Sequence, residues 1–338
     1  MHVRDYYYVL PKDRIAQHPS EKRDHSKLMI LDRKDESITH KVFHEITGEL
    51  GSGDVLVIND TKVIPARILS IKKDTRAIIE VLLLKEVERD VWEAMTKPAR
   101  RVKIGTILNV SDQITLECIG IKDEGLRVFR LTYEGLLIER LEELGDMPLP
   151  PYITERLGEQ SRYQTVYANE PKSAAAPTAG LHFTKDLLAH IASKGTQIIP
   201  ITLHVGLGTF KPVSVEQIED HHMHEETYSI SPSSATLLND AKRAHKRIIA
   251  VGTTSLRALE SNFQDGFHAG TYETKIFIYP GYQFQAIDAL ITNFHLPKST
   301  LLMLVSALAN RDFILRAYAE AIRSDYRFFS FGDAMLIK

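Results

Sequence analysis

The spacing of apolar positions divides the chain into two kinds of region. From about residue 68 to residue 143, apolar and polar residues alternate in short segments separated by Gly, Asp or charged residues. Such alternation is typical of strands with one buried face, and the close spacing predicts a small antiparallel barrel or sandwich. The segments are RAIIEVLLL (76–84), DVWEAMTK (90–97), TILNV (106–110), QITLECIG (113–120) and LRVFRLTY (126–133).

Outside this region, apolar runs of strand length alternate with segments of helical periodicity. This alternation predicts an α/β layer. Residues suited to helix ends support the pattern: Thr184 and Gly195 bracket one helical segment, and Ser231 or Ser233 precedes a second. A third segment starts at Ser299 or Thr300 and continues to residue 323. The strand-like runs are 54–59, 197–205, 246–252 and 287–293.

A proline-rich segment marks the return from one region to the other. Three of the four residues 148–151 are prolines, which favour an extended linker. We therefore predict a larger discontinuous α/β domain, residues 1–67 and 149–338, with a small antiparallel β-barrel domain, residues 68–148, inserted into it.

Composition narrows the class of protein. Cys118 is the only cysteine among 338 residues, which excludes an intrachain disulfide and a metal site built from several thiolates. It lies in an alternating segment, so we interpret it as a core thiol. The chain has no apolar stretch of membrane-spanning length and no uninterrupted apolar segment near its start, and we expect a cytoplasmic protein.

Two clusters of basic residues qualify the formal net charge of −2. That charge argues against binding to nucleic acid over the whole surface, but one basic face is sufficient for such binding. A solvated surface run is the alternative interpretation of either cluster. The first contains Lys97, Arg100, Arg101 and Lys103, and the second contains Lys22, Arg23 and Lys27.

Loops rich in His, Thr and Gly follow the strand-like runs in the second half of the chain. Nine of the fourteen histidines lie between His182 and His295. Because imidazole titrates near neutral pH and sites are often built on loops at strand ends, this distribution predicts an enzyme. The loops are 174–184, 204–212, 221–228, 251–261 and 292–300.

Two of these loops are suited to hold a ligand. In HVGLGTF (204–210), Gly206 and Gly208 allow close approach of a ligand to the backbone, although a tight turn is an equal alternative. In the loop 251–261, hydroxyl residues from Thr253 onward stand at a predicted helix start, where anions bind, and Arg257 lies one turn further on. Simple capping of the helix is the alternative there.

The histidines of the other loops have competing interpretations. His221 and His224, beside Glu225 and Glu226, suit a metal, acid–base chemistry or substrate contact, or a polar surface with no further role. We favour acid–base chemistry or substrate contact because the HExxH pattern is absent. His182 follows small residues that leave room for a flat ligand, but a buried structural histidine is the alternative. His295 follows a strand-like run directly.

Taken together, the motifs resemble the S-adenosylmethionine:tRNA ribosyltransferase-isomerase family of queuosine biosynthesis over essentially the whole chain. Besides the five loops, the resemblance includes DYYYVLPKDRIAQHP (5–19), GDVLVINDTKVIPAR (53–67), MPLPPYI (147–153), RYQTVYA (162–168) and YRFFSFGDAML (326–336). The family fold implied is a larger α/β domain with an inserted β-barrel, in agreement with the pattern above.

The resemblance also implies a reaction. The ribosyl part of S-adenosylmethionine is transferred to 7-aminomethyl-7-deazaguanine (preQ1), a guanine-type base at the wobble position of tRNA. Epoxyqueuosine-tRNA forms, and adenine and methionine leave. S-adenosylmethionine is then a co-substrate, no permanently bound cofactor or metal is implied, and we expect a monomer.

This chemistry assigns candidate roles to residues. A base must remove a proton beside the sulfonium, the amine must be neutral, and adenine leaves more easily when protonated. We expect His204, His224, Glu226 and His295 to be catalytic, with His182 in reserve. Thr253, Thr254 and Arg257 are candidates for the methionine carboxylate. Candidates for the adenosyl part are Pro177, Thr178, Gly180, Gly206, Gly208 and Thr209, and Lys97, Arg100, Arg101 and Lys103, or the region 22–27, are candidates for tRNA phosphates.

Two other functions compete with this one. An S-adenosylmethionine-dependent tRNA methyltransferase would leave S-adenosylhomocysteine, but the chain lacks the glycine-rich E/DxGxGxG loop after its first strand. A non-catalytic tRNA-binding protein would explain the basic clusters but not the many loops that carry His and Thr.

Overall fold

The protein is described by a computed structural model that covers residues 1–155, 157–206 and 213–338. The chain forms two compact units. Unit 1 contains Met1–Thr61, Pro151–Glu170 and Pro177–Lys338, and unit 2 contains Lys62–Pro150 and Pro171–Ala176. The predicted insertion, residues 68–148, lies within Lys62–Pro150.

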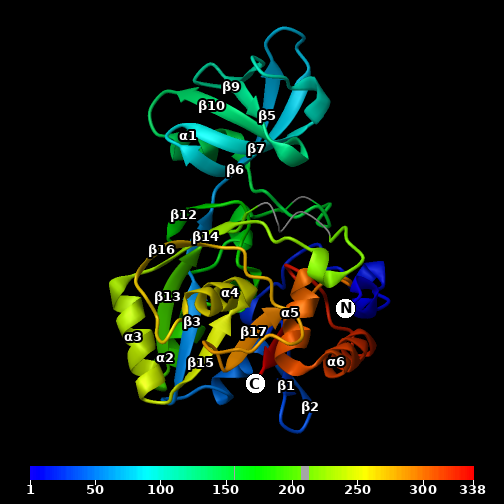
Figure 1. Ribbon diagram of the computed structural model, residues 1–338, viewed down its shortest axis with the longest axis vertical. Coiled ribbons are helices and arrows are strands. Elements are labelled where there is room, and N and C mark those ends of the chain that lie inside the picture. Colours follow the sequence, from blue (N-terminus) through cyan, green and yellow to red (C-terminus); the bar gives the residue numbers. More distant parts are fainter. Residues whose placement is uncertain (156, 207–212) are drawn as a thin grey trace. The chain divides into compact units, whose positions relative to one another are not determined.

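Unit 1 is built on a nine-stranded mixed sheet with the order β16-β14-β13-β3-β15-β17-β18-β1-β2 (Figure 1). Strands β13, β3, β15 and β17 run parallel to their neighbours within this group and form the predicted α/β layer. The bounds are β1 Lys27–Asp32, β2 Ser37–Val42, β3 Asp54–Asn59, β13 Gln197–Leu203, β14 Glu226–Ile230, β15 Arg247–Val251, β16 Gly270–Thr274, β17 Ala289–Asn293 and β18 Ala334–Ile337.

Helices cover both faces of this sheet, because its central strands are apolar on both sides. Every residue of β3 is buried, which is typical of a parallel strand between two helical layers. One core cluster joins Leu56 and Ile58 of β3 to Phe183, beside helix α2 (Lys185–Ser193), and to η4 (Phe43–Gly48). Helix α4 (Gly252–Asn262) packs on β3, β13, β15 and β17 but contributes no residue to that cluster, so it covers the opposite face.

Most helix ends follow from their capping residues. The hydroxyl of Thr184 accepts from Leu187 N–H at the start of α2, Ser231 caps α3 (Pro232–Arg243), and Ser299 caps α5 (Thr300–Ala309). Gly195 takes the left-handed conformation expected after α2. Each of these confirms a predicted helix boundary.

The single helix predicted to continue to residue 323 is wrong. Asn310 interrupts it with φ of 69°, and its side chain accepts the N–H groups of Asp312 and Phe313. These bonds start a second helix, α6 (Arg311–Arg323). The periodicity alone did not reveal the break, because apolar positions continue on both sides of it.

Unit 2 is a closed six-stranded antiparallel barrel, as predicted. The sheet order β5-β6-β7-β10-β9-β8 is closed by pairing of β8 with β5. The five strand-like segments correspond to β6 Ile78–Glu88, β7 Val91–Lys97, β8 Ile107–Ser111, β9 Ile114–Ile121 and β10 Arg127–Tyr133. Strand β5 (Arg67–Lys72) was missed, since it contributes only Ile68 and Ser70 as buried positions.

Smaller elements complete the described chain. Cys118 is fully buried in β9, and burial raises the pKa of its thiol, which confirms the core interpretation. Among the helices of the described residues, none has the length and apolar character needed to cross a bilayer. The remaining elements are β4 Thr61–Val63, which pairs with β12 Glu170–Ser173, α1 Leu137–Leu144, β11 Gly145–Asp146, and the 3-10 helices η1 Val3–Tyr6, η2 Lys12–Arg14, η3 Arg23–His25, η5 Ala99–Arg101, η6 Asp123–Gly125, η7 Gln160–Tyr163, η8 Thr178–His182 and η10 Ile218–Asp220.

Candidate active site

One edge of the sheet in unit 1 collects the predicted site residues. The parallel strands β3, β13, β15 and β17 all end there, and loops at that edge form sites in α/β proteins. His204 follows β13, Thr254 follows β15, and His295 follows β17. Strand β14 runs antiparallel to β13, so Glu226 at its start reaches the same edge.

Asn59, which sequence reasoning missed, connects neighbouring strands at this edge. Its Oδ1 accepts from the N–H groups of Leu203 (3.0 Å) and Thr61 (3.2 Å). Its Nδ2 donates to the Leu203 carbonyl (3.0 Å) and to Thr254 Oγ1 (3.2 Å). The nearby Thr61 Oγ1 lies 2.8 Å from His204 Nδ1 and orients that ring. A polar amide at the end of an otherwise apolar strand was the available signal, and the structure buries it fully.

Glu226 and Arg257 form a buried ion pair, in which each residue is 6% exposed. Glu226 Oε2 accepts from Arg257 Nη1, and Oε1 accepts from Gly206 N–H at 3.3 Å. Arg257 Nε donates to the Ile276 carbonyl at 3.4 Å. Arg257 Nη2 is buried and has no hydrogen-bond partner among the described residues. Glu226 and Arg257 were predicted to have separate roles, but they form one ion pair.

His182 lies in a chain of buried hydrogen bonds. Thr178 Oγ1 donates to Asn293 Oδ1 (3.0 Å), Asn293 Nδ2 lies 3.0 Å from His182 Nε2, and Ser26 Oγ lies 2.7 Å from His182 Nδ1. The ring also stacks on Phe43 at 4.9 Å between centroids. Burial, with Arg327 and Arg23 nearby, lowers the pKa of His182 to about 3. The ring is therefore neutral at pH 7.

His295 is also buried and neutral. Burial lowers its pKa to about 3. Its Nε2 lies 3.0 Å from Thr292 Oγ1, and its backbone N–H donates to Tyr318 Oη at 2.9 Å. The Tyr8 hydroxyl donates to its carbonyl. Two tyrosines thus hold the backbone of His295, and Thr292 near the end of β17 holds its ring.

The predicted loop 221–228 is wrong in its second half, because β14 begins at Glu226. The His221 ring meets the edge of Phe277, and burial together with His224 and His222 lowers the pKa of His221. Glu225 pairs with Lys275 at 3.1 Å. Within the described ranges, no group of three His, Cys, Asp or Glu side chains is placed to hold a metal.

The structure describes four of the six candidates for the adenosyl part, and these four lie in two separate segments. Thr178 and Gly180 lie in η8, next to Pro177, and all but Thr178 are buried. A Cβ at Gly180 would lie 2.1 Å from Tyr167 Oη, so the tyrosine already makes the close approach that glycine permits there. Gly206 bonds to Glu226 as above, whereas Gly208 and Thr209 lie outside the described residues.

The basic cluster of unit 2 stands on a braced turn. Lys97, Arg100, Arg101 and Lys103 are exposed, and in the described chain none has a carboxylate within ion-pair distance. Buried Arg127 donates to the carbonyls of Ala99 (2.7 Å), Val102 (2.8 Å) and Gly125 (2.6 Å). These three hydrogen bonds from Arg127 therefore hold in place the turn that carries the cluster.

Known proteins resemble the chain over its full length. The sequence model of a family described as queuosine biosynthesis protein matches residues 3–337. Proteins named S-adenosylmethionine:tRNA ribosyltransferase-isomerase from Staphylococcus epidermidis and Staphylococcus aureus are 56% and 54% identical over 340 residues, covering 100% of each chain. A crystal structure of S-adenosylmethionine tRNA ribosyltransferase from Thermotoga maritima is 36% identical, with a TM-score of 0.56 over 99% of this chain and 100% of that one.

Proposed function

We propose a detailed function from one premise: this chain belongs to the queuosine biosynthesis protein family. Like its relatives, it is an S-adenosylmethionine:tRNA ribosyltransferase-isomerase, with S-adenosylmethionine and tRNA as substrates. The observation that carries this conclusion is the identity of 54–56% over whole chains rather than over one motif.

The finer proposal concerns the acceptor and the products. The acceptor is 7-aminomethyl-7-deazaguanine at the tRNA wobble position, and the products are epoxyqueuosine-tRNA, adenine and methionine. A base in a single-stranded loop can leave its stack and enter a protein site, which suits an edge formed from several loops. We further propose that the enzyme acts as a monomer in the cytoplasm.

The acid–base steps are assigned to His204, His224 and Glu226. The pKa of about 3 for His182 and for His295 makes both poor proton carriers at pH 7. These two are proposed instead as neutral hydrogen-bonding groups that hold the edge in shape. Arg257 fixes the position of Glu226, and we propose that this carboxylate accepts a proton from the carbon beside the sulfonium.

The methionine carboxylate of the co-substrate is assigned to the start of α4. Arg257 Nη2 lacks a partner among the described residues, and Thr253 lies in the first turn, where helix N–H groups are unpaired. Thr254 contributes to the same turn, with its hydroxyl oriented by Asn59. A carboxylate bound there would satisfy the buried guanidinium.

The decisive experiment follows adenine release from S-adenosylmethionine, with and without tRNA that carries the deazaguanine precursor. The proposed reaction yields adenine and methionine only with that tRNA. Formation of S-adenosylhomocysteine would instead identify a methyltransferase, and absence of any product would identify a binding protein. Loss of turnover in His224→Ala and Glu226→Ala is expected, and full turnover in either variant would remove that residue from the mechanism.

The exposed cluster on unit 2 is proposed to bind tRNA phosphates. Reversing both charges, Arg100→Glu with Arg101→Glu, should weaken tRNA affinity. It should also reduce the dependence of log affinity on log salt by roughly 0.7 to 0.9 for each phosphate that is no longer neutralised. Fluorescence anisotropy of labelled tRNA over a salt series measures this. An unchanged salt slope would exclude the cluster as a phosphate-binding surface.

A further inference from the structure

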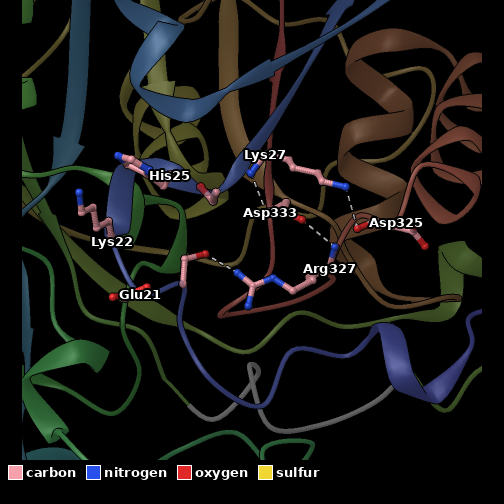
Figure 2. A pocket seen from close by; sticks show the side chains of 9 residues that line it. Glu21, Lys22, His25, Lys27, Asp325, Arg327 and Asp333 are labelled. Carbon is pink, nitrogen blue, oxygen red and sulfur yellow. Dashed lines mark hydrogen bonds between the residues drawn. The ribbon is translucent and has the colours of Figure 1, made fainter.

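A cavity of about 690 Å³ in unit 1 lies at the second basic cluster, in the region 22–27 that the sequence offered as an alternative contact for tRNA phosphates. It lies between the segment that precedes β1 and the segment that precedes β18 (Figure 2). Strand β1 pairs with β18 in parallel, and β18 pairs with β17 so that Ala334 faces Asn293. The start of β1 and the residue before Ala334 therefore reach the edge of the sheet where Asn293 lies.

Two of the three cations that line this cavity, Lys27 and Arg327, are bonded to neutral oxygens. Lys27 Nζ donates to the carbonyls of Ser324 (2.7 Å) and Asp325 (3.1 Å). Arg327 donates to the His18 carbonyl (3.2 Å) and to Ser20 Oγ. Lys22 is exposed at the rim. Over the described ranges no carboxylate lies within ion-pair distance of these three side chains, so their charges are not neutralised by direct partners.

Two of the three acidic groups that line the cavity are already engaged. Asp333 is 3% exposed and accepts the backbone N–H groups of Lys27 (2.8 Å) and Arg327 (2.7 Å), as Figure 2 shows. It thereby ties the two walls together. Asp325 pairs with Arg14 at 2.5 Å. Glu21 is left as an exposed group at the rim.

The hydrogen-bond chain through His182 ends at Ser26, a residue that lines this cavity. Because Asn293 Oδ1 accepts from Thr178, its amide nitrogen faces His182 and donates to Nε2. The neutral ring then carries its proton on Nδ1 and donates to Ser26 Oγ. The Ser26 hydroxyl must direct its own proton elsewhere, and this side chain, 2% exposed, lines the cavity.

We propose that this cavity binds a backbone phosphate of the substrate tRNA, with Lys22, Lys27 and Arg327 as cations and Ser26 as a neutral donor. The proposal rests on the proposed function, which supplies the tRNA. A phosphate group accepts several hydrogen bonds at once, so it can be bound by Lys22, Lys27 and Arg327 together. The volume is in the range of cavities that take a ligand of nucleotide size. The bound phosphate would lie at the far end of the hydrogen-bond chain that starts at Thr178.

The test measures tRNA binding directly, apart from turnover. Lys22→Gln with Lys27→Gln removes two of the three cations around the one phosphate. It should weaken tRNA affinity roughly tenfold at low salt and reduce the salt slope by roughly 0.7 to 0.9. Ser26→Ala removes a neutral donor, so it should weaken affinity several-fold with the salt slope unchanged. Lys34→Gln is the matched control, because Lys34 follows the other end of β1, and it should bind tRNA like the unmodified protein.

The outcomes separate this proposal from the proposed function. Unchanged tRNA affinity and salt slope in the double lysine variant, with its melting temperature retained, would overturn the phosphate site even if adenine release continues. Weaker binding of S-adenosylmethionine with tRNA binding intact, measured by calorimetry, would also overturn it and assign the cavity to the methionine carboxylate. Failure of the unmodified protein to release adenine would refute the proposed function while leaving the tRNA-binding measurement valid.

Discussion

Two halves of the sheet edge in unit 1 respond to burial in opposite ways. In the ion-pair half, Glu226 and Arg257 are each 6% exposed and lie within ion-pair distance of each other. In the histidine half, His182 and His295 are 5% and 8% exposed, and the pKa of each falls to about 3. Burial thus removes the charge of the two histidines, whose neighbours are hydroxyls and amides, whereas each member of the equally buried ion pair has a counter-charge beside it.

The two halves should therefore respond to different changes. A buried ion pair adds little to the free energy of unfolding, but a single buried charge without its partner lowers that free energy strongly. We therefore expect the ion-pair half to be sensitive to the loss of either residue. The histidine half is held by hydrogen bonds between neutral groups, each of which contributes less to the free energy of unfolding than the loss of one ion-pair partner would cost. Its stability should depend on pH. Three measurements test this contrast.

Breaking the ion pair should have the largest effect. Arg257→Met leaves the Glu226 carboxylate buried without its counter-charge, and the free energy of unfolding should fall by about 3–5 kcal/mol. Urea denaturation at pH 7 measures the change. The double variant Arg257→Met with Glu226→Gln removes both charges and should recover most of the loss, although not the activity. Equal stability of the single and double variants would contradict the idea that the unpaired charge is the cause.

Breaking the hydrogen-bond chain should have a smaller effect. Asn293→Ala removes a partner from both Thr178 and His182, and the free energy of unfolding should fall by about 2 kcal/mol because buried polar groups are left without their bonds. Asn169→Ala serves as a control, since Asn169 is exposed, and its effect should stay within about 0.5 kcal/mol. If Asn293→Ala lowered the free energy of unfolding as little as the control does, the hydrogen-bond chain would not contribute to stability.

The smallest effect should be the contribution of one buried histidine to stability when the pH falls by one unit. The unfolded chain protonates these histidines near pH 6.5, whereas the folded pKa is about 3 for each. Between these values the unfolded state binds more protons, so stability falls as the pH falls below 6.5 and gains nothing above it. Each histidine contributes up to about 1.4 kcal/mol per pH unit in that window.

A variant isolates this contribution from that of other groups. His295→Gln should reduce the slope of unfolding free energy against pH between about 6 and 4, measured by denaturation at several pH values. His190→Gln is the matched control, because His190 is exposed on α2 and should leave the slope unchanged. Identical slopes in His295→Gln and the unmodified protein would show that His295 is not held neutral by the fold.

Features that depend on neighbours in the chain were predictable. Ser299 and Thr184 cap helices because their hydroxyls bond to N–H groups three residues ahead. Barrel strands were visible from alternation, and the parallel strands from continuous apolar runs. Asn310 is the instructive exception, since its positive φ and side-chain bonds break a helix that the apolar pattern continues through.

Features that depend on pairing across the fold were not predictable. Glu226 and Arg257 are 31 positions apart in the chain, and Ser26 and His182 are 156 apart. The types of these residues suggested chemistry, but their partners decide whether each is charged, neutral or simply structural. Asn59 was not predicted as a site residue, although its side chain bonds to Thr61, Leu203 and Thr254 and so joins separate segments of the site edge.

The sequence by itself determined the family, the two kinds of domain, most element boundaries and the set of loops that carry polar groups, because these follow from local pattern and composition. Only the tertiary structure decided which histidines are neutral, which carboxylate is held by an arginine, and that residues near Ser26 and Asp333 enclose a cavity. The reason is physical: protonation and hydrogen bonding depend on the distance to groups far along the chain, and folding alone sets those distances.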